Sequence, residues 1–476
     1  MDANQLAQLL GTWSSGEGPL YRQLARGIGD LIDQGALRHR VRLPAERTLA
    51  TALSVSRSTT VAAYSELAEA GRLVRRQGSG TEVVASGSPG PEREQLRSSP
   101  LFDPRSESRA LLQAVPPCLV DLGEELRALA DEGPLVVEDM DPGGWWDLRV
   151  SIAARYTAEG LPTDPTQVLV TNGTQQGCAL LLRELCQPGD TILCEEHTWP
   201  GLTDAAERIG ARCHGLPMDH GGMDITRLPG AIERLRPAAI VVNPHHHNPT
   251  GTRLLPYRRR ELADIAADYG VLVIEDRVFA SLAFDGVVPP PLQAERDDAP
   301  IAVVDSLSKT VWCGYRVGWV RASADLIGRL KLVKAIDDLG TSVPSQLLAY
   351  RIFDRLDSLI AERCTDMAAR GSAAHELATS LLPDWSIPMP PGGAALWAEL
   401  PEPVARSFVR HAARCGVPLI GGDAFAVAEG TGRHVRLPFT APREELFEAL
   451  HRVADAWGTF DSTTARRHGL PSPTLV

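Results

Sequence analysis

Residues 302–309 read Ala-Val-Val-Asp-Ser-Leu-Ser-Lys. The apolar residues at the start of this stretch predict a buried β-strand, and the polar residues that follow predict where the strand ends. Its last residue, Lys309, is one of only three lysines in the chain, against 45 arginines. We expect the other two, Lys331 and Lys334, to be ordinary solvated charges. A lysine that follows two serines at a strand end instead indicates an amine placed for chemistry.

Four further apolar runs precede this strand, and helical stretches or turns separate them. They span residues 168–170, 192–194, 239–242 and 271–274. Strands that are apolar along their whole length are typical of a mostly parallel sheet with helices on both faces. The sequence therefore predicts an α/β fold for this part of the chain. Ligands of such folds bind at the carboxyl ends of the strands.

Polar segments follow four of the predicted strands. Residues 171–176 form a glycine turn that opens a helix, which is a suitable cradle for a phosphate. Residues 243–251 follow the strand at 239–242, and Glu275 and Asp276 follow the strand at 271–274. Arg316 lies seven residues after the lysine. We expect these polar groups to meet at one edge of the sheet.

Together these segments resemble the fold-type I pyridoxal-phosphate enzymes, the aminotransferase-like superfamily, from about residue 120 to the end. The motifs that carry the resemblance are Gly-Thr-Gln-Gln, His-Asn-Pro-Thr-Gly, an Asp that ends a strand, and Ser-x-Ser-Lys followed by Arg. The resemblance implies pyridoxal 5'-phosphate as the cofactor. It also implies a transferase domain of residues 121–476, with a large subdomain of about 121–325 and a small one of about 326–476.

The resemblance implies a role for each matching residue. Lys309 would form a Schiff base with the cofactor aldehyde, and Asp276 would pair with the pyridine nitrogen. Asn248 would donate to the phenolic oxygen, Trp199 would stack on the ring, and Arg436 would receive the α-carboxylate of an amino acid effector. The residues that would hold the phosphate are Gly173, Thr174, Gln175, Ser306 and Arg316.

The chain departs from many of these enzymes at two places. Relatives carry a tyrosine shortly after the pyridine-binding aspartate, but here those positions are Val278 and Phe279, so a hydroxyl that would bond the phenolic oxygen is missing. Residues 139–143 also lack the tyrosine that relatives direct to the phosphate of the partner subunit. These departures leave cofactor binding intact and count against efficient transamination.

Three consecutive histidines, residues 245–247, raise the alternative of a metal site. Neighbouring residues of an extended stretch point to opposite faces, so the three rings cannot easily ligate one ion. We therefore expect no bound metal.

The first 84 residues have a different pattern. Apolar residues at helical spacing predict a helix from Leu20 to Ile32, a proline opens a second over 43–50, and Ser56 would cap a third. Residues 73–76 and 81–84 predict the two strands of a hairpin with a glycine tip. Three helices and a hairpin make a winged helix-turn-helix domain, an α+β fold whose third helix enters the major groove.

The sequence of this segment resembles the GntR family of DNA-binding domains over residues 19–84. The net charge of the chain is −12, yet residues 20–82 hold ten arginines against six acids. The resemblance implies contacts to double-stranded DNA from Arg47, Ser56, Arg57, Ser58, Thr59 and Gly78. The alternative is that the two arginines are solvated helix charges.

Residues 85–120 begin with Gly, Pro and Ser and show no hydrophobic period, which predicts a flexible linker. A GntR-type domain of residues 1–84 joined to an aminotransferase-like domain resembles the MocR/GabR-type regulators. The resemblance implies a homodimeric, pyridoxal-phosphate-dependent transcriptional regulator that reads paired half-sites and takes an amino acid or amine effector. The alternatives are an active aminotransferase with a vestigial DNA-binding domain, and a regulator that senses only the cofactor.

The sequence also predicts the compartment. It shows no signal peptide and no apolar run long enough to span a bilayer. Its eight cysteines are scattered without a Cys-x-x-Cys pair, which indicates reduced thiols. We therefore expect a cytoplasmic, nucleoid-associated protein with no membrane partner.

Overall fold

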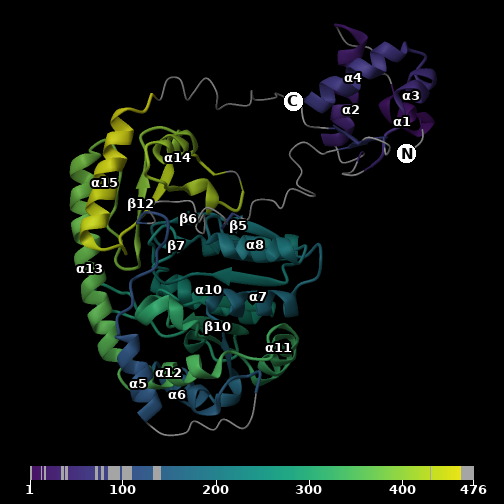
Figure 1. Cartoon of the computed structure of the whole chain (residues 1–476). Helices are drawn as coiled ribbons and strands as arrows, with labels where there is room; N and C mark the ends of the chain where they lie inside the picture. The colour runs from purple at the N-terminus through teal and green to yellow at the C-terminus, as the bar shows by residue number, and fades with distance from the viewer. Residues whose placement is uncertain are drawn as a thin grey trace. The chain divides into compact units, whose positions relative to one another are not determined.

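The computed structural model describes residues 3–11, 13–14, 18–33, 37, 41–69, 73–76, 80–83, 97–98, 110–131, 141–428 and 430–461. The chain divides into two compact units, residues 1–96 and 97–476, whose elements are labelled in Figure 1. Within the described residues, no helix is long and apolar enough to cross a membrane.

The smaller unit confirms the winged helix-turn-helix prediction. Its described helices are α1 (Ala3–Leu10), α2 (Leu20–Asp33), α3 (Glu46–Ala52) and α4 (Arg57–Glu69), and its hairpin pairs β1 (Leu73–Arg76) antiparallel with β2 (Gly80–Val83). Leu24, Leu49 and Tyr64 are fully buried in its core. Ser56 caps α4 as predicted, because its Oγ accepts a hydrogen bond from the Thr59 amide at 3.1 Å.

Two details of the smaller unit differ from the prediction. The sequence pattern does not predict α1, although its Leu6 and Leu10 are buried in the same core. The second predicted helix begins at Glu46 and not at Leu43. The Leu43 amide donates to the Thr81 carbonyl oxygen at 2.9 Å, and this bond to the hairpin keeps the chain extended before the helix.

The larger unit contains a seven-stranded sheet in the order β3-β11-β10-β9-β8-β4-β5. β11 runs antiparallel to both of its neighbours, and the pairs from β10 to β5 are parallel, so the prediction of a mostly parallel sheet is confirmed. The strands are β3 (Val168–Thr171), β4 (Thr191–Glu195), β5 (Arg212–Leu216), β8 (Ala239–Val242), β9 (Val273–Asp276), β10 (Ile301–Ser306) and β11 (Gly318–Arg321).

Helices cover both faces of this sheet. Alternate residues of one strand enter different cores: Ala302 and Val304 pack with α7 and α8, whereas Val303 packs with α6 and α12. The helices of this part are α5 (Leu122–Asp131), α6 (Trp146–Ala158), α7 (Thr174–Leu185), α8 (Pro200–Arg208), α9 (Leu228–Leu235), α10 (Pro256–Tyr269), α11 (Ala324–Asp337) and α12 (Val343–Phe353). A small hairpin pairs β6 (Met218–Asp219) with β7 (Gly222–Met223).

A second, three-stranded sheet lies in the C-terminal part of the larger unit. Its antiparallel order is β12-β14-β13, with β12 (Ala395–Glu399), β13 (Ile420–Gly421) and β14 (His434–Pro438). It packs with α13 (Leu356–Leu381), α14 (Ala405–Arg414) and α15 (Arg443–Gly458) around one core, and α13 lies along α15 in Figure 1.

The end of the predicted linker belongs to the larger unit, which corrects the prediction of a tether up to residue 120. Ala110 and Leu111 are buried in the core of the C-terminal part, and Leu112 and Ala114 are buried beside it. The segment has no regular period because it is a coil pinned by side chains from elsewhere. One of those bonds is from Thr440 Oγ1 to the Gln113 carbonyl oxygen, at 3.0 Å.

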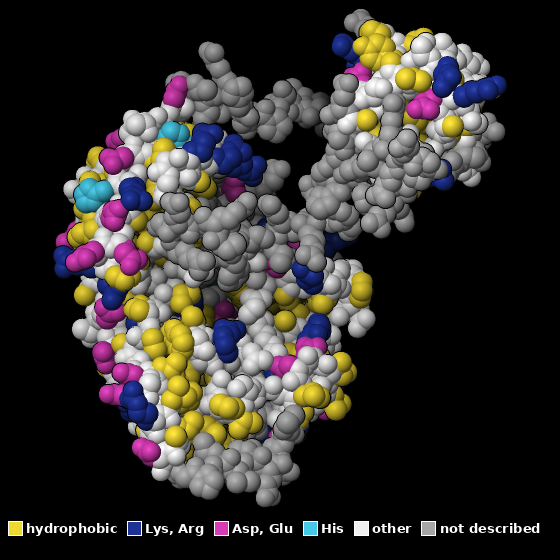
Figure 2. Space-filling view, viewed as in Figure 1, with side chains coloured by type: hydrophobic (Ala, Val, Ile, Leu, Met, Phe, Trp, Pro, Cys, Tyr) yellow, Lys and Arg dark blue, Asp and Glu magenta, His cyan; other side chains and the backbone are white. Residues whose placement is uncertain are grey.

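The larger unit also leaves apolar side chains exposed on two helices. Trp146 and Val150 are exposed on α6, and Leu332 and Ile336 of α11 are 70% and 88% exposed. Residues four apart lie on one face of a helix, so each pair forms an apolar face. Figure 2 shows hydrophobic side chains gathered over the region where Figure 1 labels α12 and α6.

Candidate functional site

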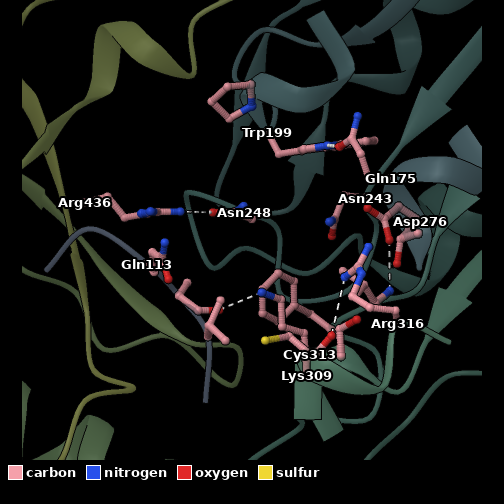
Figure 3. A pocket seen from close by; sticks show the side chains of 17 residues that line it. Gln113, Gln175, Trp199, Asn243, Asn248, Asp276, Lys309, Cys313, Arg316 and Arg436 are labelled. Carbon is pink, nitrogen blue, oxygen red and sulfur yellow. Dashed lines mark hydrogen bonds between the residues drawn. The ribbon is translucent and has the colours of Figure 1, made fainter. Parts of the chain in front are cut away.

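A cavity of about 470 Å³ opens at the carboxyl ends of the central strands, where the sequence predicts a ligand site. Figure 3 shows its side chains converging from strand ends, from the segment before α5 and from β14. The lining residues are Gln113, Ala114, Val115, Thr174, Gln175, Trp199, Pro200, Asn243, Asn248, Asp276, Val278, Phe279, Ser308, Lys309, Cys313, Arg316 and Arg436. Of the predicted cofactor residues, Gly173 and Ser306 are not in the lining and lie beside Thr174.

Lys309 lies in a single π-helical turn, Ser308–Trp312, directly after β10. Its Nζ donates to the Ala114 carbonyl oxygen at 2.7 Å and lies 5.4 Å from the centre of the Phe279 ring. Burial of the amine, together with the charge of Arg436, lowers the pKa of Lys309 to about 8. A substantial fraction of the amine is therefore neutral and nucleophilic near physiological pH.

Asp276 ends β9 and is almost fully buried. Burial raises the pKa of its carboxyl to about 7, although the Val278 amide donates to Oδ1 at 2.9 Å and favours the charged form. A carboxyl that ionises near neutral pH can hold a protonated ring nitrogen and share its proton.

The loop between β3 and α7 forms a cradle suited to an anion. Gly173 has a φ of +89°, and a Cβ at this position would lie 3.0 Å from the Arg316 guanidinium. Arg316 donates to the Asn172 carbonyl oxygen, and Thr174 Oγ1 lies 3.1 Å from Ser306 Oγ. The helix N-terminus, one guanidinium and two hydroxyls are therefore gathered where an oxyanion can bind.

Arg436 enters the cavity from β14 and is 2% exposed. Its Nη1 donates to Asn248 Oδ1 at 3.1 Å, and its Nη2 donates to the Leu112 carbonyl oxygen at 2.6 Å. Burial lowers the pKa of Arg436 to about 10. The structure therefore brings together two residues that the resemblance assigns to two molecules, Asn248 to the cofactor and Arg436 to an amino acid effector.

Trp199 stands at the mouth of the cavity, immediately before α8. Its indole N–H donates to Gln175 Oε1 at 2.9 Å, and the side-chain Nε2 of Gln175 donates to the Gly201 carbonyl oxygen at 2.8 Å. These bonds fix the orientation of both side chains at one side of the cavity (Figure 3).

Several lining residues were not predicted from the sequence. Gln113 and Ala114 come from the segment interpreted as linker, and Cys313 lies one turn after the lysine. Asn243 carries a signal that could have found it, because it is the first polar residue after β8. Val278 and Phe279, at which the resemblance implies a tyrosine, line the cavity, so Lys309 faces an aromatic ring without a hydroxyl.

The three histidines are buried, and two of them, His245 and His247, are directed to different partners. His245 Nε2 lies 3.0 Å from Glu275 Oε1, and His247 Nδ1 lies 2.9 Å from Thr250 Oγ1. Burial lowers the pKa of His245 and of His247 to about 3. In the described part of the chain, no group of three or more His, Cys, Asp or Glu residues could hold a metal ion.

The start of α4 in the smaller unit holds most of the predicted DNA contacts. Arg47, Ser56, Arg57 and Ser58 are exposed, and Thr59 is half-buried. The Ser56 hydroxyl lies 2.7 Å from Ser58 Oγ and 2.8 Å from Thr59 Oγ1, so these hydroxyls form one cluster at the helix start. Gly78 lies outside the described residues.

Comparison with known families accounts for both units. The profile of the aminotransferase class I and II family matches residues 122–453, and that of the gntR family of bacterial regulatory proteins matches residues 20–83. The chain belongs to the aminotransferase class I and II family. It joins a GntR-type DNA-binding domain to an aminotransferase class I and II domain.

Individual relatives divide in the same way. YdfD of Bacillus subtilis, named an HTH-type transcriptional regulator, is 26% identical over 476 residues, covering 91% of this chain and 95% of its own. Aromatic-amino-acid aminotransferase 1 of Thermococcus litoralis is 27% identical over 328 residues, covering 66% of this chain and 78% of its own. The crystal structure of an archaeal alanine:glyoxylate aminotransferase has a TM-score of 0.70 at 25% identity, covering 78% of this chain and 94% of its own.

The aminotransferase class I and II fold implies pyridoxal phosphate as the cofactor. The cavity fits this group, because it contains the amine of Lys309, the buried carboxyl of Asp276 and, beside Arg316, the cradle suited to an anion. Within the described residues, two buried lining atoms also lack a hydrogen-bond partner, Asn243 Oδ1 and Arg436 Nε. Buried polar atoms are normally satisfied, so these two are available to a bound molecule.

Proposed function

We propose that this chain is a pyridoxal-phosphate-dependent transcriptional regulator that binds operator DNA through residues 1–84. The observation that carries this proposal is the presence, in one chain, of an exposed GntR-type helix start and a cavity lined by Lys309, Asp276 and Arg316. The regulator-like relative that covers 91% of the chain supports the same conclusion. The protein would act in the cytoplasm, associated with the nucleoid.

Three residues would hold the cofactor ring. Lys309 would bond to the aldehyde carbon through its neutral amine, Asp276 would pair with the pyridine nitrogen, and Asn248 would donate to the phenolic oxygen. When bound, pyridoxal phosphate supplies an aldehyde that captures amines and a ring that withdraws electrons. Trp199 would cover the ring from the mouth of the cavity.

The phosphate would lie at the N-terminus of α7. Arg316 would supply a charged fork, and the remaining donors would be Gly173, Thr174, Gln175 and Ser306. Position 173 has a φ of +89°, which favours glycine, and a Cβ there would lie 3.0 Å from the Arg316 guanidinium and crowd it.

An amino acid effector would place its carboxylate on Arg436. The guanidinium is oriented by Asn248 and by the Leu112 carbonyl oxygen, and its Nε is buried without a partner within the described residues. Since Leu112 lies in the segment that leads back toward residues 1–96, effector binding would act on this segment. A ligand shifts a conformational equilibrium only by its differential affinity for the two states.

The protein would act as a homodimer that reads an operator with paired half-sites. The apolar faces of α6 and α11 support self-association, since exposed apolar faces of this kind mark protein interfaces. Two winged helices related by a two-fold axis would contact half-sites about one helical turn, or multiples of it, apart.

The test is operator binding and transcription with the full chain, with and without pyridoxal phosphate and with a panel of amino acids and amines. We expect the cofactor, or the cofactor with one amine, to change the footprint or the affinity on the chain's own upstream DNA. If neither ligand changes affinity, footprint or transcription, the proposed sensing function is wrong. A response to the cofactor alone would favour a cofactor sensor.

A second candidate function is that of a working aminotransferase. It is favoured by the coexistence in one cavity of Arg436 and a lysine with a pKa of about 8. The missing hydroxyl at Val278 and Phe279 counts against it. Release of keto acids over many turnovers at rates typical of enzymes, above about 1 per second, would establish this function in place of pure regulation.

A further inference from the structure

Lys334 is a helix lysine whose side chain is buried, although the sequence predicts that it is solvated. The sequence predicts that Lys331 and Lys334 are both solvated, but only Lys331 is, with a 41% exposed side chain that pairs with Asp141. The Lys334 side chain is 0% exposed. Its Nζ donates to both carboxylate oxygens of Asp338, at 2.7 and 2.9 Å, and lies 3.2 Å from Gln176 Oε1.

Asp338 connects this lysine to the loop between β3 and α7. Its Oδ2 accepts hydrogen bonds from Asn172 Nδ2 at 2.8 Å and from Gln176 Nε2 at 2.7 Å, and its Oδ1 accepts one from the Gly340 amide. The Asn172 amide in turn donates to Gln176 Oε1 at 2.7 Å. The carboxylate and its lysine therefore fix both ends of the short segment 172–176.

That segment contains the anion cradle of the cavity. The Asn172 carbonyl oxygen accepts a hydrogen bond from Arg316, and Gly173 and Thr174 follow at once. The chain of contacts thus runs from Lys334 through Asp338 and Asn172 to the guanidinium that faces the cavity. Neither Lys334 nor Asp338 lines the cavity itself.

A buried ion pair is a costly way to stabilise a fold, because desolvation offsets most of the attraction between the charges. Its better-attested use is to fix one geometry. Burial lowers the pKa of Lys334 against the opposing effect of Asp338. Burial alone would raise the pKa of Asp338, but the hydrogen bonds from Lys334 and Gln176 bring it below its usual value. The contact with Asp338 thus favours the charged amine against the effect of burial, and the lowered pKa of Asp338 favours the charged carboxylate.

We propose that Lys334 and Asp338 are positioning residues that set the affinity of the cavity for the phosphate group of its cofactor. They would act through Asn172 and Gln176 by holding the loop in the conformation that presents the α7 N-terminus and Arg316 to the phosphate. The proposal rests on the proposed binding of pyridoxal phosphate in this cavity.

The experiment compares pyridoxal phosphate with pyridoxal, which carries the same aldehyde and ring without the phosphate. Each ligand is titrated into the cofactor-free full chain, and binding is followed by absorbance and tryptophan fluorescence. We expect Lys334→Met to weaken pyridoxal phosphate binding on the order of tenfold, as loss of a supporting residue behind a ligand site commonly does. Pyridoxal binding should not change.

Lys331→Met is the matched control, since it removes a lysine one turn away on the same helix and should alter neither affinity. Asp338→Asn should reproduce the selective loss, and it keeps the proposal testable if Lys334→Met does not fold. An equal loss for both ligands would indicate a merely structural role and overturn the proposal, as would unchanged binding of both. A wild-type chain that does not bind pyridoxal phosphate would overturn the proposed function as well.

Discussion

The two candidate binding regions of this chain are built in opposite ways. The cavity of the larger unit gathers residues separated by hundreds of positions, from Gln113 to Arg436, and two of its charged groups, Asp276 and Arg436, are buried. The start of α4 presents four consecutive residues, 56–59, mostly exposed to solvent. One region is assembled by the tertiary fold, and the other is a local property of one helix.

This difference determines what each region can sense. Burial shifts the pKa of Lys309 and of Asp276 toward neutrality, so we expect ligand binding in the cavity to depend on pH. Exposed arginines next to hydroxyl groups suit phosphate backbones and base edges, whose binding depends on salt. Substitution of a cavity residue such as Lys309 should therefore abolish cofactor binding almost completely. Substitution of a residue at the start of α4 should weaken operator binding without abolishing it.

The largest expected effect is that of Lys309→Ala. This variant removes the amine to which the cofactor aldehyde would bond, so the absorbance band of lysine-bound pyridoxal phosphate should disappear completely. Operator binding without cofactor should persist, because the smaller unit is untouched. Lys331→Ala is the control and should keep the band. A retained band in Lys309→Ala would show that Lys309 is not the amine that bonds to the cofactor aldehyde.

Arg57→Ala should have the next largest effect, confined to the other region. If Arg57 reads a base, operator affinity should fall by about 1–3 kcal/mol, measured by electrophoretic mobility shift at fixed salt. The cofactor band should not change. Arg57→Lys distinguishes the kind of contact: a phosphate contact tolerates lysine, whereas a bidentate base contact does not. Unchanged operator affinity in Arg57→Ala would make Arg57 an ordinary solvated charge.

The contrast between local and tertiary features also explains which strands the sequence predicted and which it missed. The central strands were predicted because apolar runs of three or four residues, separated by helical stretches or turns, are typical of an α/β chain. β5 was missed because it lies at the edge of the sheet, and its first four residues, Arg212 to Gly215, are not fully buried. β11 was missed because its sequence, Gly-Trp-Val-Arg, is not an uninterrupted apolar run, and because it follows directly on the Arg316 segment.

For the site, residues within recognisable motifs were predicted and residues brought in by the fold were not. The structure gathers Lys309, Asp276, Asn248 and Arg436 around one cavity, although each comes from a different motif. Ala114 has no local signal, since its bond to Lys309 depends on contacts made 195 residues away. Lys334 was wrongly expected to be solvated, because helical spacing alone does not reveal which polar partner covers a buried lysine.

A smaller effect is expected from pH, which should change the rate of cofactor binding in the cavity but not the operator affinity of the smaller unit. With a pKa of about 8, the neutral fraction of Lys309 rises about fivefold between pH 7 and pH 8 and then levels off. The rate at which the cofactor-free chain develops its absorbance band should follow this curve. An unperturbed lysine would keep gaining rate beyond pH 9. Operator affinity should stay flat, because arginine and hydroxyl side chains keep their charge in this range.

Arg436→Met is the control for the pH profile. Since the charge of Arg436 helps to lower the pKa of Lys309, its removal should move the midpoint of the rate curve to higher pH. A midpoint that stays in place would show that Arg436 does not perturb the amine, and a wild-type rate that keeps rising beyond pH 9 would show that the cavity does not perturb it.

The smallest effect concerns stability and tests whether the two units also differ in their cores. Tyr64 is fully buried and donates its hydroxyl proton to the Pro44 carbonyl oxygen at 3.0 Å, which joins α4 to the turn before α3. Tyr64→Phe leaves that oxygen without this donor and should lower the free energy of unfolding of the smaller unit by about 1 kcal/mol. The matched change in the larger unit is Tyr156→Phe, which removes the acceptor of the Trp319 indole N–H at 2.9 Å. In urea denaturation of the full chain, each variant should shift only the transition of its own unit. A single transition that moves in both variants would show that the units unfold together, and the comparison of two independent regions would then fail.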